Sequence, residues 1–265
     1  MKDSIRQVQL VEYEILKELD RICKKHDIKY WLGQGTLLGA AKYQKFIPWD
    51  DDIDLLIPWQ DLKNLQEVFE KEAKEEYLLT NVRKEKHFPL SWTKIRNTKT
   101  LSRPAKYKDI PINWGICIDL FPVYPLSDNK LLRKLEIFMH KLANKMLMAG
   151  FTKYEEGHGF VERFFEKIPV GVRILARKTA DFFLEKGKEN SEYVLVTCKG
   201  AKCIKRDLLW GEECYLPFED GEYRAPNKYH EYLTLNYGDY MAPLPENEQR
   251  GHDLFMGEIE WKLNI

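Results

Sequence analysis

Hydrophobic residues recur at helical spacing in several parts of the chain, and each run predicts a helix. In residues 4–26, the apolar positions Val8, Val11, Ile15, Leu19 and Ile22 fall on one face. A short helix is predicted over 35–44 and another over 60–75. Two long helical stretches, rich in Leu, Phe, Lys and Arg, are predicted over 129–150 and 160–188.

Shorter apolar runs between the first helices predict strands. These runs cover 28–33, 50–57 and 115–126, with the last strand ending at Pro122, and residues 88–103 are predicted to form a hairpin. Strands that alternate with helices indicate an α/β (α+β) fold with a mixed sheet. We expect a core over 1–126, a helical region over 127–206 and an aromatic-rich C-terminal segment over 207–265 that packs on the core.

Composition and charge narrow the class of protein. The chain is 44% hydrophobic and 32% charged, as in an ordinary globular protein, and its 42 Lys and Arg balance 42 Asp and Glu. This balance argues against nucleic acid as a partner, because a polyanion normally requires a basic excess. No apolar run is long enough for a membrane span, and the N-terminus is too polar for a signal peptide, so we expect a cytoplasmic protein. Five irregularly spaced cysteines do not predict a disulfide framework.

Carboxylates crowd the start of the strand predicted over 50–57. In a strand, Asp50, Asp52 and Asp54 would point to one face and Asp51 to the other. A solvated acidic turn would explain such a cluster equally simply. The flanking residues Ile53, Leu55, Leu56 and Ile57 nevertheless indicate a buried strand, where uncompensated carboxylates are costly. Hard oxygen ligands suit Mg²⁺, so Asp52 and Asp54 are predicted to bind a metal.

Two further features support phosphate chemistry near these acids. Gly35 and Thr36 open the predicted helix at 35–44, and helix N-termini attract phosphate groups. Asp119 is a single charge within the apolar run Cys117–Phe121 and is the candidate third acid. An ion pair with a Lys or Arg is the alternative explanation for Asp119.

These residues resemble a known family. YWLGQGTLLGAAKYQKFIPWDDDID (30–54) is similar to the signature of the LicD family, which includes fukutin-like glycan phosphotransferases. GICIDLFPVYPL (115–126) resembles the second acidic strand of that family, and residues 216–252 resemble its C-terminal segment. The resemblance covers nearly the whole chain and is least specific over 127–206.

The resemblance implies a nucleotidyltransferase-like core and transfer of a phospho-alcohol, phosphocholine above all, from a CDP-activated donor to a hydroxyl. The implied acceptor is a glycan or lipid-linked glycan, such as teichoic acid, and CMP would leave. Mg²⁺ is the implied cofactor, with Mn²⁺ as a substitute. A protein of this class would work in the cytoplasm at the inner face of the membrane, in peripheral contact with a membrane-linked acceptor.

By motif position, the resemblance makes Asp52, Asp54 and Asp119 the metal-binding and catalytic acids. Gly35 and Thr36 correspond to the phosphate turn. The other implied donor-binding residues are Lys42, where the family often has Arg, Lys94, Arg96 and His252.

Three alternatives remain open at the level of sequence. A nucleotidyltransferase that moves NMP from an NTP would use the same three acids. A non-catalytic module could bind glycans or choline through its aromatic side chains, which include seven Trp and 14 Tyr. Cys198, Cys203 and Cys214, with His230, could form a zinc site, although free thiols fit their spacing better.

Overall fold

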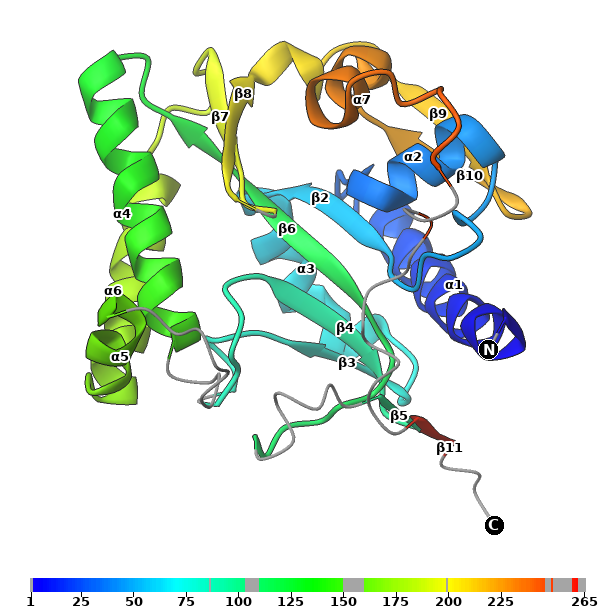
Figure 1. Ribbon diagram of the computed structural model, residues 1–265, viewed down its shortest axis with the longest axis horizontal. Helices are drawn as coiled ribbons and strands as arrows, with labels where there is room; N and C mark the ends of the chain where they lie inside the picture. Colours follow the sequence, from blue (N-terminus) through cyan, green and yellow to red (C-terminus); the bar gives the residue numbers. More distant parts are fainter. Residues whose placement is uncertain are drawn as a thin grey trace.

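The computed structural model describes residues 2–85, 87–102, 110–149, 160–198, 200–245, 249 and 259–261. A seven-stranded mixed sheet lies at its centre in the order β1-β2-β6-β4-β3, and β7 and β8 continue it from β6 (Figure 1). The strands are β1 Trp31–Leu32, β2 Asp54–Pro58, β3 Tyr77–Thr80, β4 Thr93–Asn97, β6 Cys117–Leu126, β7 Tyr193–Val196 and β8 Lys202–Lys205. The predicted α+β architecture with a mixed sheet is confirmed.

The long strand β6 joins the two parts of this sheet. On one side it pairs with β2 in parallel, and on the other it pairs antiparallel with β4 and then with β7. The predicted end of this strand at Pro122 is wrong, because β6 continues to Leu126. A proline lacks the N–H that a ladder needs. Pro122 is accommodated because it lies at the change of partner, after the β4 pairing ends at Leu120 and before the β7 pairing begins at Val123.

The first three helices form where the apolar spacing predicts them. They are α1 Lys2–Lys25, α2 Gln34–Tyr43 and α3 Trp59–Glu72. On α1, Ile15, Leu16, Leu19 and Ile22 are fully buried in the main core, which also contains the apolar residues of β2 and β6. The predicted strand over 28–33 is reduced to the two residues of β1.

The hairpin predicted within residues 88–103 is wrong. The strand β4 pairs with β3 and β6, whereas β5 Thr100–Ser102 pairs antiparallel with β11 Ile259–Trp261 in a separate two-stranded sheet. The partner of β5 lies far along the chain, so local turn residues could not indicate this pairing.

The middle of the chain forms a group of helices beside the sheet: α4 Lys130–Ala149, α5 Phe160–Glu166 and α6 Val170–Glu185. The stretch predicted as one helix over 160–188 is two helices, because Pro169 caps α6 with an extended backbone. Residues 193–205 return to the main sheet as β7 and β8. Since no observation tests the boundaries at 126 and 206, the division into three domains stays a prediction.

The C-terminal part packs on the core. It contains the short 3-10 helix η2 Arg206–Leu208, the hairpin of β9 Cys214–Phe218 and β10 Gly221–Ala225, and α7 Tyr229–Tyr237. Phe218 and Tyr223 make edge-on ring contacts with Tyr13 of α1. Figure 1 shows α1, α2 and α7 gathered on one side of β6, while α4, α5 and α6 stand on the other.

Candidate active site

Asp50, Asp51 and Asp52, here called the acidic segment, precede β2, and Asp54 is the first residue of that strand. The prediction that Asp50, Asp52 and Asp54 alternate along one strand is wrong, because β2 begins at Asp54 and residues 50–53 have no regular structure. The carboxylates nevertheless meet in space. Burial raises the pKa of Asp54 well above its ordinary value, and the neighbouring charges of Asp52, Asp119 and Asp50 raise it further.

Two helices hold this segment in place. The Thr36 hydroxyl accepts a 2.8 Å hydrogen bond from the backbone N–H of Asp54, and Gly33 N–H donates to the Asp54 carbonyl at 2.9 Å. From α1, the buried Gln9 side chain donates to the Asp50 carbonyl at 2.8 Å. A Cβ at Gly35 would overlap Asp50 Oδ2, so glycine lets that carboxylate approach the first turn of α2. The predicted phosphate turn thus also supports the acids.

A row of three charged residues crosses the sheet beside this segment. Asp54 of β2 lies opposite Asp119 of β6, and Asp119 lies opposite Lys94 of β4. Laterally paired residues project from the same face of a sheet, so the three side chains are neighbours. Lys94 donates to Asp119 in a short ion pair that is mostly buried. The ion pair considered as an alternative for Asp119 is therefore present, next to Asp54.

Glu12 of α1 also faces this site, and the sequence analysis missed it. Its side chain is 3% exposed, and Oε2 has no hydrogen-bond partner among the described residues. Burial raises the pKa of Glu12 well above its ordinary value, and the charges of Asp52, Cys117, Asp51 and Asp50 add to this shift. The signal was available in the sequence, because Glu12 interrupts the apolar face of α1, four residues after Val8.

The C-terminal helix α7 contributes aromatic hydroxyls to the site. Tyr237 is 43% exposed, and partial desolvation together with the charges of Asp54 and Asp50 raises its pKa, so the phenol keeps its proton. Gln34 links α2 to α7 by donating to the hydroxyl of Tyr232 at 2.8 Å and to Sγ of Cys198 at 2.9 Å. Its φ of 43° is unusual for a residue other than glycine, and these contacts hold it there.

The remaining predicted donor-binding residues are not all brought to the acids. Lys42 lies in the last turn of α2, at the opposite end from Gly35, and donates to the carbonyls of Tyr240 and Ala242. The Arg96 guanidinium is 1% exposed and binds the Gly115 carbonyl at 3.2 Å beside the ring of Trp114. His252 lies outside the described residues.

The acidic segment suits a hard cation by its donor chemistry. Asp54 is partly buried beside other carboxylates, a combination that raises its pKa and that a divalent cation would relieve. Magnesium commonly uses only one or two protein carboxylates together with substrate phosphates. Among the described residues, no three His, Cys, Asp or Glu side chains are grouped closely enough to form a complete metal site by themselves.

The zinc alternative is not supported by the positions of the cysteines. Cys198 is buried against Gln34, Cys203 is exposed on β8, and Cys214 lies on β9; all three are free thiols. His230 bonds instead to the Tyr240 hydroxyl.

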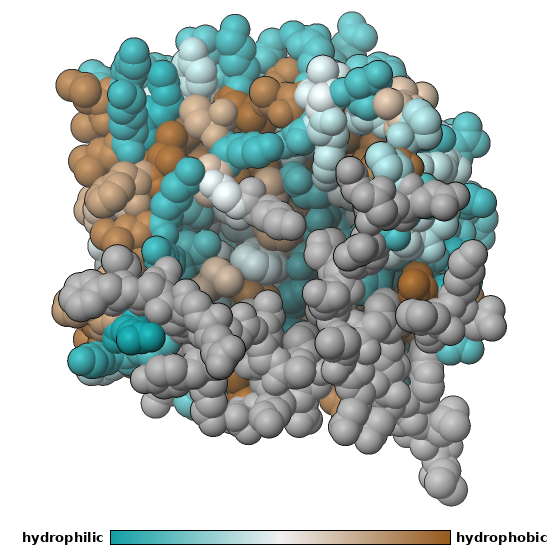
Figure 2. Space-filling view, in the orientation of Figure 1, coloured by the Kyte–Doolittle hydropathy of each residue, from teal (hydrophilic) through white to brown (hydrophobic). Residues whose placement is uncertain are grey.

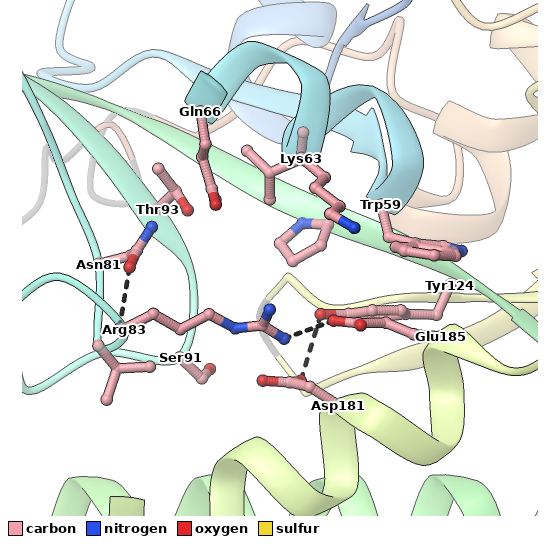
Figure 3. A pocket seen from close by; sticks show the side chains of 13 residues that line it. Trp59, Lys63, Gln66, Asn81, Arg83, Ser91, Thr93, Tyr124, Asp181 and Glu185 are labelled. Atoms are coloured by element: carbon pink, nitrogen blue, oxygen red, sulfur yellow. Dashed lines mark hydrogen bonds and ion pairs between the residues drawn. The ribbon is translucent and has the colours of Figure 1, made fainter. Parts of the chain in front are cut away.

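A second polar region, drawn in Figure 3, lies on the face of the sheet from which Pro122 and Tyr124 of β6 project, opposite to Asp119. It is a cavity of about 50 Å³ between α3, α6, β4 and β6. Around it, Arg83 pairs with Glu185, and the Tyr124 hydroxyl donates to Asp181 at 3.2 Å. Asp181 also pairs with Arg177, which is fully buried, so each of the two acids in this region has an arginine partner.

Comparison with known proteins shows which protein family this chain resembles. Residues 27–148 match the model of the LicD family, described as LicD/FKTN/FKRP, nucleotidyltransferase domain. This range contains Gly35, Thr36, Lys94, Asp119 and the acidic segment. The resemblance to the LicD family noted in the sequence is therefore confirmed over residues 27–148.

Two relatives show how far the likeness extends. The lipopolysaccharide cholinephosphotransferase LicD of Haemophilus influenzae is 27% identical, over 96% of this chain and 97% of its own length. The ribitol 5-phosphate transferase FKRP of Homo sapiens is 46% identical over 46 residues, which are 17% of this chain and 9% of the relative. The family match and these relatives support the assignment of the protein as an enzyme, a phosphotransferase.

Proposed function

We propose that the protein transfers phosphocholine from CDP-choline to a hydroxyl of a cell-surface glycan, a teichoic acid or another polysaccharide, and releases CMP. The observation that carries the proposal is the row of Asp54, Asp119 and Lys94 beside the acidic segment. Phosphoryl transfer depends mainly on positioning and on neutralising charge, and this row offers both. The similarity to a lipopolysaccharide cholinephosphotransferase along nearly the whole chain supports the choice of choline and of a glycan acceptor.

In the proposed reaction, an oxygen of the acceptor hydroxyl attacks the phosphorus that carries choline. The bond from that phosphorus to the CMP oxygen breaks, and the electron pair leaves with CMP. Asp119, which is held by its ion pair with Lys94, accepts the proton of the hydroxyl. The first turn of α2, at Gly35 and Thr36, holds the donor phosphates. Tyr237 donates a hydrogen bond to the donor or the acceptor.

We assign Mg²⁺, which Mn²⁺ can replace, to Asp52 and Asp54. A divalent cation bound there would supply charge neutralisation at the diphosphate. Removal of divalent cations with excess EDTA should abolish CMP release, and added Mg²⁺ should restore it. Full turnover in EDTA would rule out this assignment.

The test of the reaction is a panel of CDP-alcohols with a glycan acceptor and Mg²⁺, read by CMP release. CDP-choline should be consumed faster than CDP-ribitol and CDP-glycerol. If CDP-ribitol reacts and CDP-choline does not, the donor is wrong while the reaction class stands. Pyrophosphate release from an NTP would favour the alternative nucleotidyltransferase, and binding without any product would favour a non-catalytic module.

A further inference from the structure

The helix α4 turns an apolar stripe to the solvent. Leu131, Leu135 and Phe138 are 77%, 55% and 59% exposed, and Leu132 and Met139 are exposed beside them. Their spacing places them on one side of the helix, whereas His140, Ala143 and Leu147 face the interior. An amphipathic helix normally buries its apolar stripe, so this one is unusual in a folded domain.

The neighbouring helix α6 extends this surface. It packs against α4 and exposes Val172, Leu175, Phe182 and Phe183. Figure 2 shows hydrophobic side chains gathered along the edge of the molecule where Figure 1 places α4, with hydrophilic groups among them. We call these nine residues the outer apolar surface: Leu131, Leu132, Leu135, Phe138, Met139, Val172, Leu175, Phe182 and Phe183.

Lysines border this surface on one side. Lys134, Lys141 and Lys145 of α4 follow one another at spacings of seven and four residues, so they share the flank of the apolar stripe. Lys130 lies on the same flank, and Lys178 is exposed on α6. The single acid of α4, Glu136, lies on a different side of the helix, where its carboxylate accepts a hydrogen bond from the backbone N–H of Ser127.

The surface is held firmly to the catalytic sheet. Asp181 of α6 accepts from Tyr124 of β6, and Arg177 of α6 binds the His140 carbonyl of α4. Glu185 of α6 pairs with Arg83 (Figure 3). The two helices are therefore fixed relative to β6, and whatever binds them is held at a constant orientation to the active site.

We propose that the outer apolar surface docks on an anionic phospholipid bilayer. Apolar side chains on one face with lysines at its border are typical of helices that lie in the membrane interface. The leucines and phenylalanines enter the boundary between headgroups and acyl chains, and the lysines meet lipid phosphates. Within the described part of the chain, no helix has both the length and the apolar character needed to cross a bilayer. Contact at the interface is thus the form of membrane binding that this surface fits.

Sedimentation with vesicles tests the proposal without using enzymatic activity. The whole protein is mixed with vesicles of phosphatidylcholine alone, or of phosphatidylcholine and phosphatidylglycerol in equal parts. We expect binding to the anionic vesicles to be at least about tenfold stronger and to weaken with salt. The double variant Leu135→Glu/Phe138→Glu should lose at least about tenfold in binding, and Lys134→Gln/Lys141→Gln/Lys145→Gln should lose the preference for anionic lipid.

The matched control is Leu10→Glu, which places the same charge at an exposed leucine of α1. It should bind vesicles like the unaltered protein, and circular dichroism should show that every variant is folded. Equal binding by the Leu135→Glu/Phe138→Glu variant, or no binding by the unaltered protein, would overturn the proposal. So would a concentration-dependent dimer in analytical ultracentrifugation that the same double substitution abolishes, because the surface would then join two copies of the chain. Failure of CDP-choline turnover would leave these outcomes unchanged.

Discussion

The two faces of β6 carry largely buried charged groups that differ in how their acids are paired. On one face, Asp119 lies beside Asp54 and the acidic segment, and Lys94 is its ion-pair partner. On the other, Asp181 and Glu185 each pair with an arginine. Buried charges stabilise a fold only when they are well compensated. The face on which each acid pairs with an arginine, the balanced face, is therefore structural. On the other, acid-rich face, neighbouring carboxylates raise the pKa of Asp54, and a cationic ligand would oppose that shift.

Asp54→Asn should give the largest difference between the two faces in its effects on activity and on stability. This substitution removes a charge from the crowded side, and we expect kcat/KM to fall by about 10⁴-fold. The melting temperature should stay constant or rise in metal-free protein, because the lost carboxylate has a pKa that burial raises. CMP release and thermal melting measure both effects. A variant that melts early would show Asp54 to be structural.

An Asp→Asn substitution on the balanced face should lower stability and leave activity unchanged. Asp181→Asn leaves Arg177, which is fully buried, without its carboxylate, and should reduce the free energy of unfolding by about 3–5 kcal/mol. Turnover per folded molecule, measured well below the melting temperature, should be unchanged. Urea denaturation gives the first quantity. Loss of activity in a fully folded Asp181→Asn protein would place this network in the reaction.

The sequence alone predicted several of the helices and some of the site residues, but not how the acids are arranged in space. Helical spacing located α1, α2 and α3, and the single charge in an apolar run singled out Asp119. Period-two alternation misplaced the start of β2, because loop carboxylates can converge as closely as those on a strand. The pairing of Lys94 with Asp119 could not be predicted from local sequence, since 24 residues lie between them along the chain.

The sequence also did not indicate that residues of α7 lie near the acids. Tyr237 lies within the electrostatic influence of the acids because α7 packs against α2, and Gln34 of α2 donates a hydrogen bond to Tyr232 of α7. Nothing in the spacing of those residues specifies this packing. The surface of α4 was visible as helical periodicity, but only the structure shows that its apolar stripe faces outward.

Asp119→Asn should lower both stability and activity, each by less than the two substitutions above. Lys94 loses its partner, yet Asp54 lies next in the row and can take up part of the charge, so the expected loss is about 1–3 kcal/mol of stability. Activity should fall by about 10²-fold, as for loss of a general base. Adding Lys94→Gln should restore stability and leave activity low. Full activity in Asp119→Asn would remove this carboxylate from the proposed site.

The smallest effect is expected at Glu12, which stands behind the acids without a described hydrogen-bond partner for Oε2. Burial raises its pKa above the ordinary value of 4.5, so the folded protein holds this proton more tightly than the unfolded chain. The contribution of Glu12 to stability is thus fully present below pH 4.5 and is lost as the pH rises through the raised pKa. Each such group adds a slope of about 1.4 kcal/mol per pH unit within that window.

Glu12→Gln should reduce this slope in metal-free protein and raise the melting temperature at neutral pH by roughly 2–4 °C, the equivalent of about 1 kcal/mol. Asp54 contributes a slope of the same sign, so part of the dependence should remain. Glu14→Gln is the matched control, because Glu14 lies on the same helix with a mostly exposed carboxylate. Melting curves between pH 4 and pH 9 for the three proteins decide the point. Equal dependence of stability on pH in Glu12→Gln and the unaltered chain would mean that Glu12 is compensated in the folded state. Glu12 would then not belong to the group of interacting acids.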